Sequence, residues 1–310
     1  MHVAVAVVVN SEQKVLIAKR PDHVHQGGFW EFPGGKVEQD EAVYDALCRE
    51  IREELQIRIQ NAHPLIKITH HYKDKSVLLD VWLVTEFQGK EHGAEGQPLM
   101  WQSIHDLNPD TFPAANRKII AALQLPDKLL ITGDFSNLHD FNTRLVRSLQ
   151  FGVKLIQLRC KAKCDTETYQ AIVHLSKSLC ESSKAKLLLN SDPELADELQ
   201  LGLHVNSRDL FEYHHRPITR DRLLSVSCHN LTDLQQAETL QADFALLSPV
   251  QCTSSHPEKS GMGWQAFADL TSAINIPVFA LGGMHASDIN VARQAGGQGI
   301  AAISELWGGK

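Results

Sequence analysis

Short apolar runs alternate with polar stretches along the whole chain and predict a protein that contains both strands and helices. In the first 125 residues, the runs at 3–9, 15–19 and 77–85 have the length and the β-branched content that strands favour. The stretch at 42–55 is predicted to be a helix and lies between the second and third of these runs. We therefore expect a mixed sheet flanked by helices in this part of the chain.

Eight further apolar runs occupy the rest of the chain, and helix-like segments such as 166–180 and 232–240 separate most of them. Eight such repeats predict a (β/α)8 barrel with its chemistry at the C-terminal ends of the strands. The chain ends six residues after Ser304, so the last helix should be missing or very short, which could expose apolar barrel surface. The runs span residues 129–132, 155–159, 186–190, 202–205, 223–227, 244–249, 277–281 and 299–304.

A proline marks the expected boundary between two domains. A helix-like stretch at 116–123 precedes Pro126, and a new apolar run follows it. Proline ends a helix and disfavours the helical conformation in the residue before it. A length of 310 residues also suggests two domains, which we place at 1–126 and 127–310.

The composition is compatible with a soluble enzyme and indicates little else. A formal net charge of −7 disfavours nucleic acid as a partner, and no apolar run is long enough to span a membrane. The six cysteines include no CxxC pair, so reduced thiols in a cytoplasmic protein are expected. The sequence leaves the oligomeric state open.

Three carboxylates share one face of the predicted helix at 42–55. Glu50, Glu53 and Glu54 stand at positions i, i+3 and i+4, within reach of a common ion. Such a cluster is costly unless a cation neutralises it, and hard oxygen ligands suit Mg²⁺ or Mn²⁺, which also bind phosphate oxygens. The expected ligand is therefore a polyphosphate bridged through metal. The alternative is an exposed acidic helix with ordinary ion pairs, such as Arg49 with Glu53.

The surrounding segment resembles the Nudix box, whose pattern is Gly, five residues, Glu, seven residues, Arg-Glu, an aliphatic residue, any residue and Glu-Glu. Gly35, Glu41 and the run from Arg49 to Glu54 match these positions. Gln56 stands where the pattern has a second glycine, which often takes a left-handed conformation at the helix end. Gln can adopt that conformation at a cost of about 1 kcal/mol, so the departure affects stability more than chemistry.

The resemblance extends to the MutT-type 8-oxo-dGTP diphosphatases over almost all of residues 1–125, through segments 30–36, 95–98 and 112–116 and through Trp101. It implies an α/β/α sandwich with a mixed sheet. It also implies Mg²⁺-dependent hydrolysis of 8-oxo-dGTP to the monophosphate and pyrophosphate by attack of water on phosphorus, with Mn²⁺ as a second candidate cation. The metal would be held by the carbonyl of Gly35 and the carboxylates of Glu50, Glu53, Glu54 and Glu95.

Several charged residues have roles that the sequence leaves open. Arg49 would orient a neighbouring glutamate, although an exposed pair with Glu53 worth ~0.5 kcal/mol describes it equally well. Glu41 would be an auxiliary ligand or a cap at the helix entrance. Arg20 and Lys36 could neutralise phosphate charge or remain solvated. Spacing does not decide which carboxylate removes the proton from water.

Asn116 and Phe32 are the candidates for base recognition. 8-Oxoguanine carries a donor at N7 beside the O6 acceptor, whereas guanine presents two acceptors. A carboxamide can accept from N7–H and donate to O6, a pairing that guanine cannot satisfy. The alternatives are a helix N-cap for Asn116 and a core aromatic role for Phe32.

Residues 129–306 resemble thiamine phosphate synthase and its relative, the TenI-type thiazole tautomerase, through 156–159 with Lys161, Asn190, 203–205 and 278–283. Gly282-Gly283 and Ile303-Ser304 lie where barrels commonly bind phosphate through backbone N–H groups, with tight turns as the alternative. The resemblance implies a phosphorylated thiazole or thiamine-like ligand. Its expected contacts are Gln157, Arg159, Gly282, Gly283 and Ser304.

The departures from the synthase matter more than the matches. Ser191 replaces a metal-binding aspartate, Asn206-Ser207 precedes Asp209 where the synthase has Gly-Gln, and His256 takes the place of a lysine. These changes should weaken a step that expels pyrophosphate. His229, in Ser227-Cys228-His229, aligns with the proton-transferring histidine of the tautomerase, with a helix-capping role as the alternative.

The sequence therefore favours a Mg²⁺-dependent 8-oxo-dGTP diphosphatase fused to a degenerate barrel that binds a phosphorylated thiazole or acts as a tautomerase. Two alternatives remain. The first domain would hydrolyse a diphosphate of the thiamine pathway, or the barrel would be a non-catalytic binding or interaction module.

Overall fold

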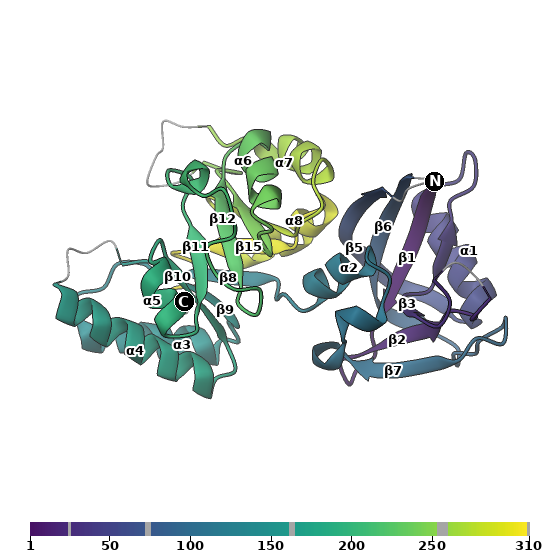
Figure 1. Cartoon of the computed structure of the whole chain (residues 1–310), viewed down its shortest axis with the longest axis horizontal. Helices are drawn as coiled ribbons and strands as arrows, with labels where there is room; N and C mark the ends of the chain where they lie inside the picture. The colour runs from purple at the N-terminus through teal and green to yellow at the C-terminus, as the bar shows by residue number, and fades with distance from the viewer. Residues whose placement is uncertain (24–25, 72–75, 161–164, 253–259, 309–310) are drawn as a thin grey trace. The chain divides into compact units, whose positions relative to one another are not determined.

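The chain divides into two compact units, Met1–Gln124 and Leu125–Lys310 (Figure 1). The computed structural model describes residues 1–23, 26–71, 76–160, 165–252 and 260–308. The boundary predicted after residue 126 lies two residues beyond the division between the units. None of the helices in the described ranges combines the length and the apolarity that crossing a membrane requires.

Two sheets form the framework of the N-terminal unit. The larger has the order β4-β1-β6-β5, in which β1 runs parallel to β6 and the other pairs are antiparallel. The smaller has the order β3-β2-β7 and is antiparallel throughout. The expectation of a mixed sheet is therefore confirmed. The strands are β1 (His2–Val8), β2 (Lys14–Lys19), β3 (Trp30–Glu31), β4 (Gly34–Lys36), β5 (Arg58–His71), β6 (Ser76–Gln88) and β7 (Leu99–Ser103).

Alternating side chains of β1 connect the two faces of the larger sheet to two helices. Ala4, Ala6 and Val8 share a buried cluster with α1 (Val43–Leu55), and Val5 and Val7 share another with α2 (Asn116–Leu123). The period-two alternation of a strand thus buries both faces and produces the α/β/α arrangement. The helix α1 is capped at its C-terminal end by Gln56, which has a left-handed φ of 58°. This is the conformation expected where the Nudix box pattern has its second glycine.

The C-terminal unit is a closed barrel of eight parallel strands, as predicted. Apolar side chains fill the barrel interior, where Phe244 and Phe279 meet edge to face at 5.3 Å between ring centroids. Ligands can therefore reach only the ends of the barrel. Its strands are β8 (Lys128–Ile131), β9 (Leu155–Leu158), β10 (Lys186–Asn190), β11 (Gly202–Val205), β12 (Leu224–Cys228), β13 (Phe244–Leu247), β14 (Val278–Leu281) and β15 (Gly299–Ala302).

In the described part of the chain, no helix follows β15. The helices around the barrel are α3 (Leu138–Gln150), α4 (Thr166–Ser182), α5 (Pro193–Glu198), α6 (Leu231–Thr239), α7 (Gly263–Ser272) and α8 (Ile289–Gln294).

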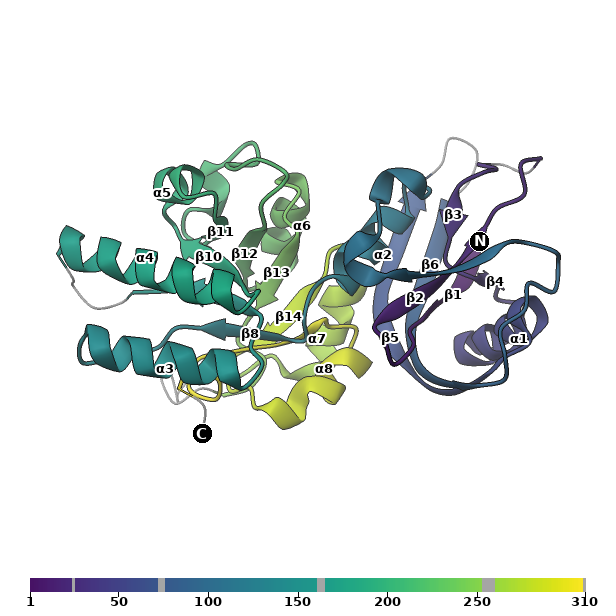
Figure 2. The same ribbon diagram turned by 90° about the horizontal axis from the view of Figure 1, so that it is seen from below.

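The segment after β15 packs beside α3 (Figure 2). Trp307 is buried, and its indole Nε1 donates to the carbonyl of Asp134 at 2.9 Å. The hydroxyl of Ser148 donates to the carbonyl of Leu306 at 2.7 Å. Leu306 and Trp307 are therefore buried in the apolar cluster between the barrel strands and the surrounding helices.

Candidate active sites

The helix α1 directs Glu50 and Glu54 toward the Gly34-Gly35 strand. The backbone N–H of Gly34 donates to Oε2 of Glu54 at 3.1 Å. A Cβ placed on Gly35 would lie 2.1 Å from the carboxyl carbon of Glu50, so only glycine leaves room for that carboxylate. Glu53 differs from both, because its side chain is 64% exposed and lies 3.8 Å from Arg49.

Negative charge gathers around Glu54. Burial is the main cause that raises the pKa of Glu54 to about 7; Glu31, Glu50 and Glu95 contribute to this rise, and the Gly34 N–H opposes it. These hard oxygen donors and the space that Gly35 provides fit a Mg²⁺ or Mn²⁺ ion. Within the described residues, no three His, Cys, Asp or Glu side chains converge closely enough to hold a metal without adjustment.

Glu31 belongs to this cluster and was not predicted. Burial raises its pKa, Glu95 adds to the rise, and Arg20, which donates to its carboxylate, opposes it. Arg20 is therefore held beside the carboxylate cluster by Glu31. Glu31 lies in a strand of only two residues, which is too short to show a periodic pattern.

Arg49 links the helix entrance to the predicted metal ligands. Its guanidinium donates to both oxygens of Glu41 at 2.9 and 2.8 Å, to Glu50 at 2.7 Å and to the carbonyl of Lys36 at 3.0 Å. These bonds and the N–H of Glu38 lower the pKa of Glu41 to about 2. Arg49 thus orients Glu50, while its contact with Glu53 is the weakest it makes. The side chain of Lys36 is exposed.

Phe32 and Asn116 belong to one region of the N-terminal unit. Phe32 is buried and stacks on Phe112 at 5.4 Å between ring centroids. Asn116 is 9% exposed, and its carboxamide makes no hydrogen bond to the described residues. The N-cap interpretation of Asn116 is wrong, because Ala115 holds that position in a helical conformation and no side chain caps the helix.

A polar layer lies above the apolar interior of the barrel. Leu203 and Val205 face the surrounding helices, so His204 between them points inward, where Ser225 and Ser227 each lie 2.7 Å from one of its ring nitrogens. Burial, with a contribution from Arg159, lowers the pKa of His204 to about 3, so the ring is neutral. His204 is not among the predicted site residues, although a histidine interrupts this apolar strand.

Gln157 and Asn190 complete this layer. The amide nitrogen of Gln157 donates to Oδ1 of Asn190 at 2.9 Å, and Oε1 of Gln157 is buried without a partner among the described residues. At the position of the lost aspartate, the amide of Asn206 donates to Ser191 and to Asp209, each at 2.7 Å. Of the predicted ligand contacts, Gln157 bonds Asn190 in this layer and Arg159 lies close enough to His204 to affect its pKa. Lys161 and His256 fall outside the described residues.

His229 follows β12 at the same end of the barrel. Its Nδ1 lies 2.7 Å from the carbonyl of Ser248 and its Nε2 3.2 Å from the hydroxyl of Ser207. The carbonyl can only accept, so Nδ1 carries the proton and Nε2 is the acceptor in the neutral ring. The helix-capping interpretation is wrong, because Asn230 is the N-cap of α6 and accepts from the N–H of Asp233.

Gly282 and Gly283 form a turn that a side chain would disrupt. Both have positive φ, 99° and 69°, and a Cβ on Gly283 would lie 2.5 Å from the carbonyl oxygen of Cys252. Ser304 follows β15, the neighbour of β14 in the barrel. The two turns therefore follow adjacent strands, as a shared phosphate site requires. The steric need for glycine fits a phosphate-binding turn and a simple tight turn equally well.

Comparison with protein families finds one match in each unit. Residues 4–122 match the NUDIX domain model, and residues 129–306, more than half of the chain, match the thiamine monophosphate synthase model. The chain belongs to both families. It is a Nudix hydrolase joined to a thiamine phosphate synthase-like barrel, and Nudix hydrolases generally need a divalent cation, usually Mg²⁺.

Three relatives illustrate the range of activities. The N-terminal region is 36% identical over 124 residues to the 8-oxo-dGTP diphosphatase of Escherichia coli K12, covering 40% of this chain and 96% of that protein. It is 38% identical over 99 residues to the CTP pyrophosphohydrolase of the same organism, covering 32% and 73%. The barrel is 32% identical over 183 residues to putative thiamine-phosphate synthase 2 of Aquifex aeolicus, covering 59% and 98%.

Proposed function

We propose that the Nudix unit hydrolyses 8-oxo-dGTP to the monophosphate and pyrophosphate in the cytoplasm. The observation that carries this proposal is the carboxamide of Asn116, which has no hydrogen-bond partner among the described residues and lies in the same unit as the stacked Phe32. A carboxamide of this kind pairs with the N7–H and O6 of the oxidised base. Similarity to the Escherichia coli diphosphatase supports the same choice.

Glu50, Glu53, Glu54, Glu95 and the carbonyl of Gly35 would hold Mg²⁺ or Mn²⁺. When bound, the cation supplies charge neutralisation and lowers the pKa of a coordinated water. The protein contributes orientation: Arg49 fixes Glu50 at 2.7 Å, and the Gly34 N–H fixes Glu54 at 3.1 Å. Arg20, positioned by Glu31, and Lys36 offset phosphate charge.

Replacement of Asn116 tests the base assignment. Asn116→Ala should lower the preference for 8-oxo-dGTP over dGTP, measured as a ratio of kcat/KM values, by about tenfold to a hundredfold, because two hydrogen bonds to the base are lost. Asn61→Ala, at an exposed position in the same unit, is the matched control and should leave the ratio unchanged. An unchanged ratio in the Asn116 variant would remove the assignment.

For the barrel we propose binding of a phosphorylated thiazole or thiamine-like ligand at the polar layer, with His229 as proton carrier in a tautomerisation. The fixed tautomer of His229, which leaves Nε2 as an acceptor, favours this role. Isomerisation of a phosphorylated thiazole, followed by NMR, should fall by about a hundredfold or more in His229→Asn.

Two outcomes separate the alternatives. Ligand binding that survives His229→Asn without any turnover in the unmodified protein would make the barrel a non-catalytic module. Faster hydrolysis of thiamine diphosphate than of 8-oxo-dGTP would move the Nudix unit to the thiamine pathway.

A further inference from the structure

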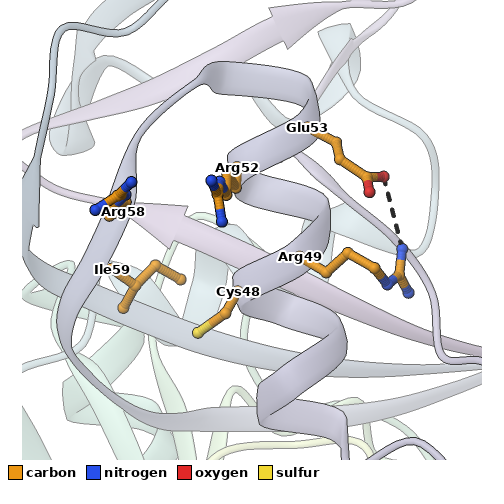
Figure 3. A pocket seen from close by; sticks show the side chains of 6 residues that line it. All are labelled: Cys48, Arg49, Arg52, Glu53, Arg58 and Ile59. Carbon is orange, nitrogen blue, oxygen red and sulfur yellow. Dashed lines mark ion pairs between the residues drawn. The ribbon is translucent and has the colours of Figure 1, made fainter.

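A second pocket lies on the outer side of α1, away from the Gly34-Gly35 strand. Its volume is about 530 Å³. Arg52 is two residues from both Glu50 and Glu54, which places it roughly 200° around the helix from each of them. Arg52 therefore points away from Glu50 and Glu54, although Arg49 and Glu53 of the proposed metal site also line the pocket. It is lined by Cys48, Arg49, Arg52, Glu53, Arg58 and Ile59 (Figure 3).

The reversal at Gln56 builds this pocket. The left-handed conformation of Gln56 ends α1 and turns the chain, so that β5 begins at Arg58, two residues later. Arg58 and Ile59 consequently return alongside the last turns of α1. Arg52 and Arg58 line the same pocket, and Figure 3 shows Arg49 turned toward Glu53.

The charge in the pocket is unbalanced. Arg49 is committed to Glu41 and Glu50, and the carboxylate of Glu53 lies closest to Arg49. The exposed side chains of Arg52 and Arg58 make no ion pair with any described residue. The pocket therefore carries local positive charge in a chain whose formal net charge is −7.

We propose that this pocket binds a phosphate-bearing small molecule through Arg52 and Arg58. Guanidinium groups present paired N–H donors that match phosphate oxygens, and a pocket of this volume admits a ligand of nucleotide size. Ile59 offers an apolar wall. The C-terminal end of α1 repels anions, so the arginine side chains must supply the attraction. The proposed contacts Arg52 and Arg58 have no role in the proposed hydrolysis, although Arg49 and Glu53 line this pocket as well.

Equilibrium dialysis of the full chain tests the proposal with pyrophosphate and with ADP, each in EDTA so that no divalent metal contributes. The double variant Arg52→Gln/Arg58→Gln should bind pyrophosphate at least about tenfold more weakly, because charge-assisted hydrogen bonds are removed. Arg147→Gln is the matched control, since Arg147 is also exposed and lies in the last turn of a helix. It should bind as the unmodified protein does.

A second variant keeps the test sensitive. Arg52→Lys/Arg58→Lys retains the charge but loses the paired donors. Its affinity for pyrophosphate should lie between that of the unmodified protein and that of the Gln double variant. Tighter, arginine-dependent binding of ADP would identify a nucleotide as the source of the phosphate, whereas equal binding would identify the bare anion. If the Gln double variant binds pyrophosphate and ADP as tightly as the unmodified protein does, the proposal is overturned. That result would not bear on the proposed hydrolysis, which a separate assay measures.

Discussion

Gly35→Ala perturbs the predicted metal site by a single methyl group. The added Cβ would lie 2.1 Å from the carboxyl carbon and Oε2 of Glu50 and 2.4 Å from its Oε1, more than an ångström inside ordinary van der Waals contact. Gly35 does not have positive φ, so its backbone tolerates alanine. The carboxylate of Glu50 must therefore move by about 1 Å, which disturbs its 2.7 Å bond from Arg49.

A displacement of this size at a reacting site costs on the order of a hundredfold in rate. We expect Gly35→Ala to lower kcat for 8-oxo-dGTP by about that factor, measured as pyrophosphate release, while the melting temperature changes little because Glu50 is a movable side chain. Combining Gly35→Ala with Glu50→Asp supplies an internal control. The shorter side chain vacates the space, so the double variant should be no slower than Glu50→Asp alone. Wild-type turnover by Gly35→Ala would refute the steric argument.

Three further predictions concern stability. The pKa of Glu54 is raised to about 7, so the metal-free folded protein binds more protons than the unfolded chain between pH 4.5 and 7. Glu54 therefore makes the free energy of unfolding fall as pH rises through that window. Urea titrations should show this fall in the unmodified protein and its loss in Glu54→Gln. His204 acts in the opposite direction, because its pKa of about 3 lies below the ordinary histidine value of 6.5. Stability should therefore fall as pH drops from 6.5 toward 3, and it should fall less steeply in His204→Gln. Trp307→Ala should lower the free energy of unfolding by about 3–5 kcal/mol, and Trp307→Phe should lower it clearly less. Equal decreases in the two variants would argue against packing as the cause.

The sequence predicts those parts of the fold that have regular periodicity. The helix α1 and the eight barrel strands follow from it directly. Strand β5 does not, because its register shifts between Ile59 and Asn61 and again between Pro64 and Ile66 interrupt the period-two pattern. Strands β3 and β4 contain only two and three residues and leave no pattern to find.

The candidate sites were predictable where residues are close in sequence and less so where the fold brings them together. Glu50 and Glu54 share a helix, whereas Glu31 lies on the separate strand β3 and acts on Glu54 only in the folded unit. The capping interpretation of Asn116 failed because α2 begins at Asn116 itself, and its N-cap, Ala115, already has helical φ and ψ. His204 depends on which face of β11 points inward, which only the closed barrel determines.

The most direct test of the central claim is competition among triphosphates. Purified protein with Mg²⁺ should be given equimolar 8-oxo-dGTP, dGTP and CTP, and the monophosphates formed should be quantified over time. We expect 8-oxo-dGMP and pyrophosphate to form first, with dGTP consumed at least about tenfold more slowly. Equal consumption of dGTP and 8-oxo-dGTP, or preferential loss of CTP, would contradict the assignment of this protein to the oxidised purine nucleotide.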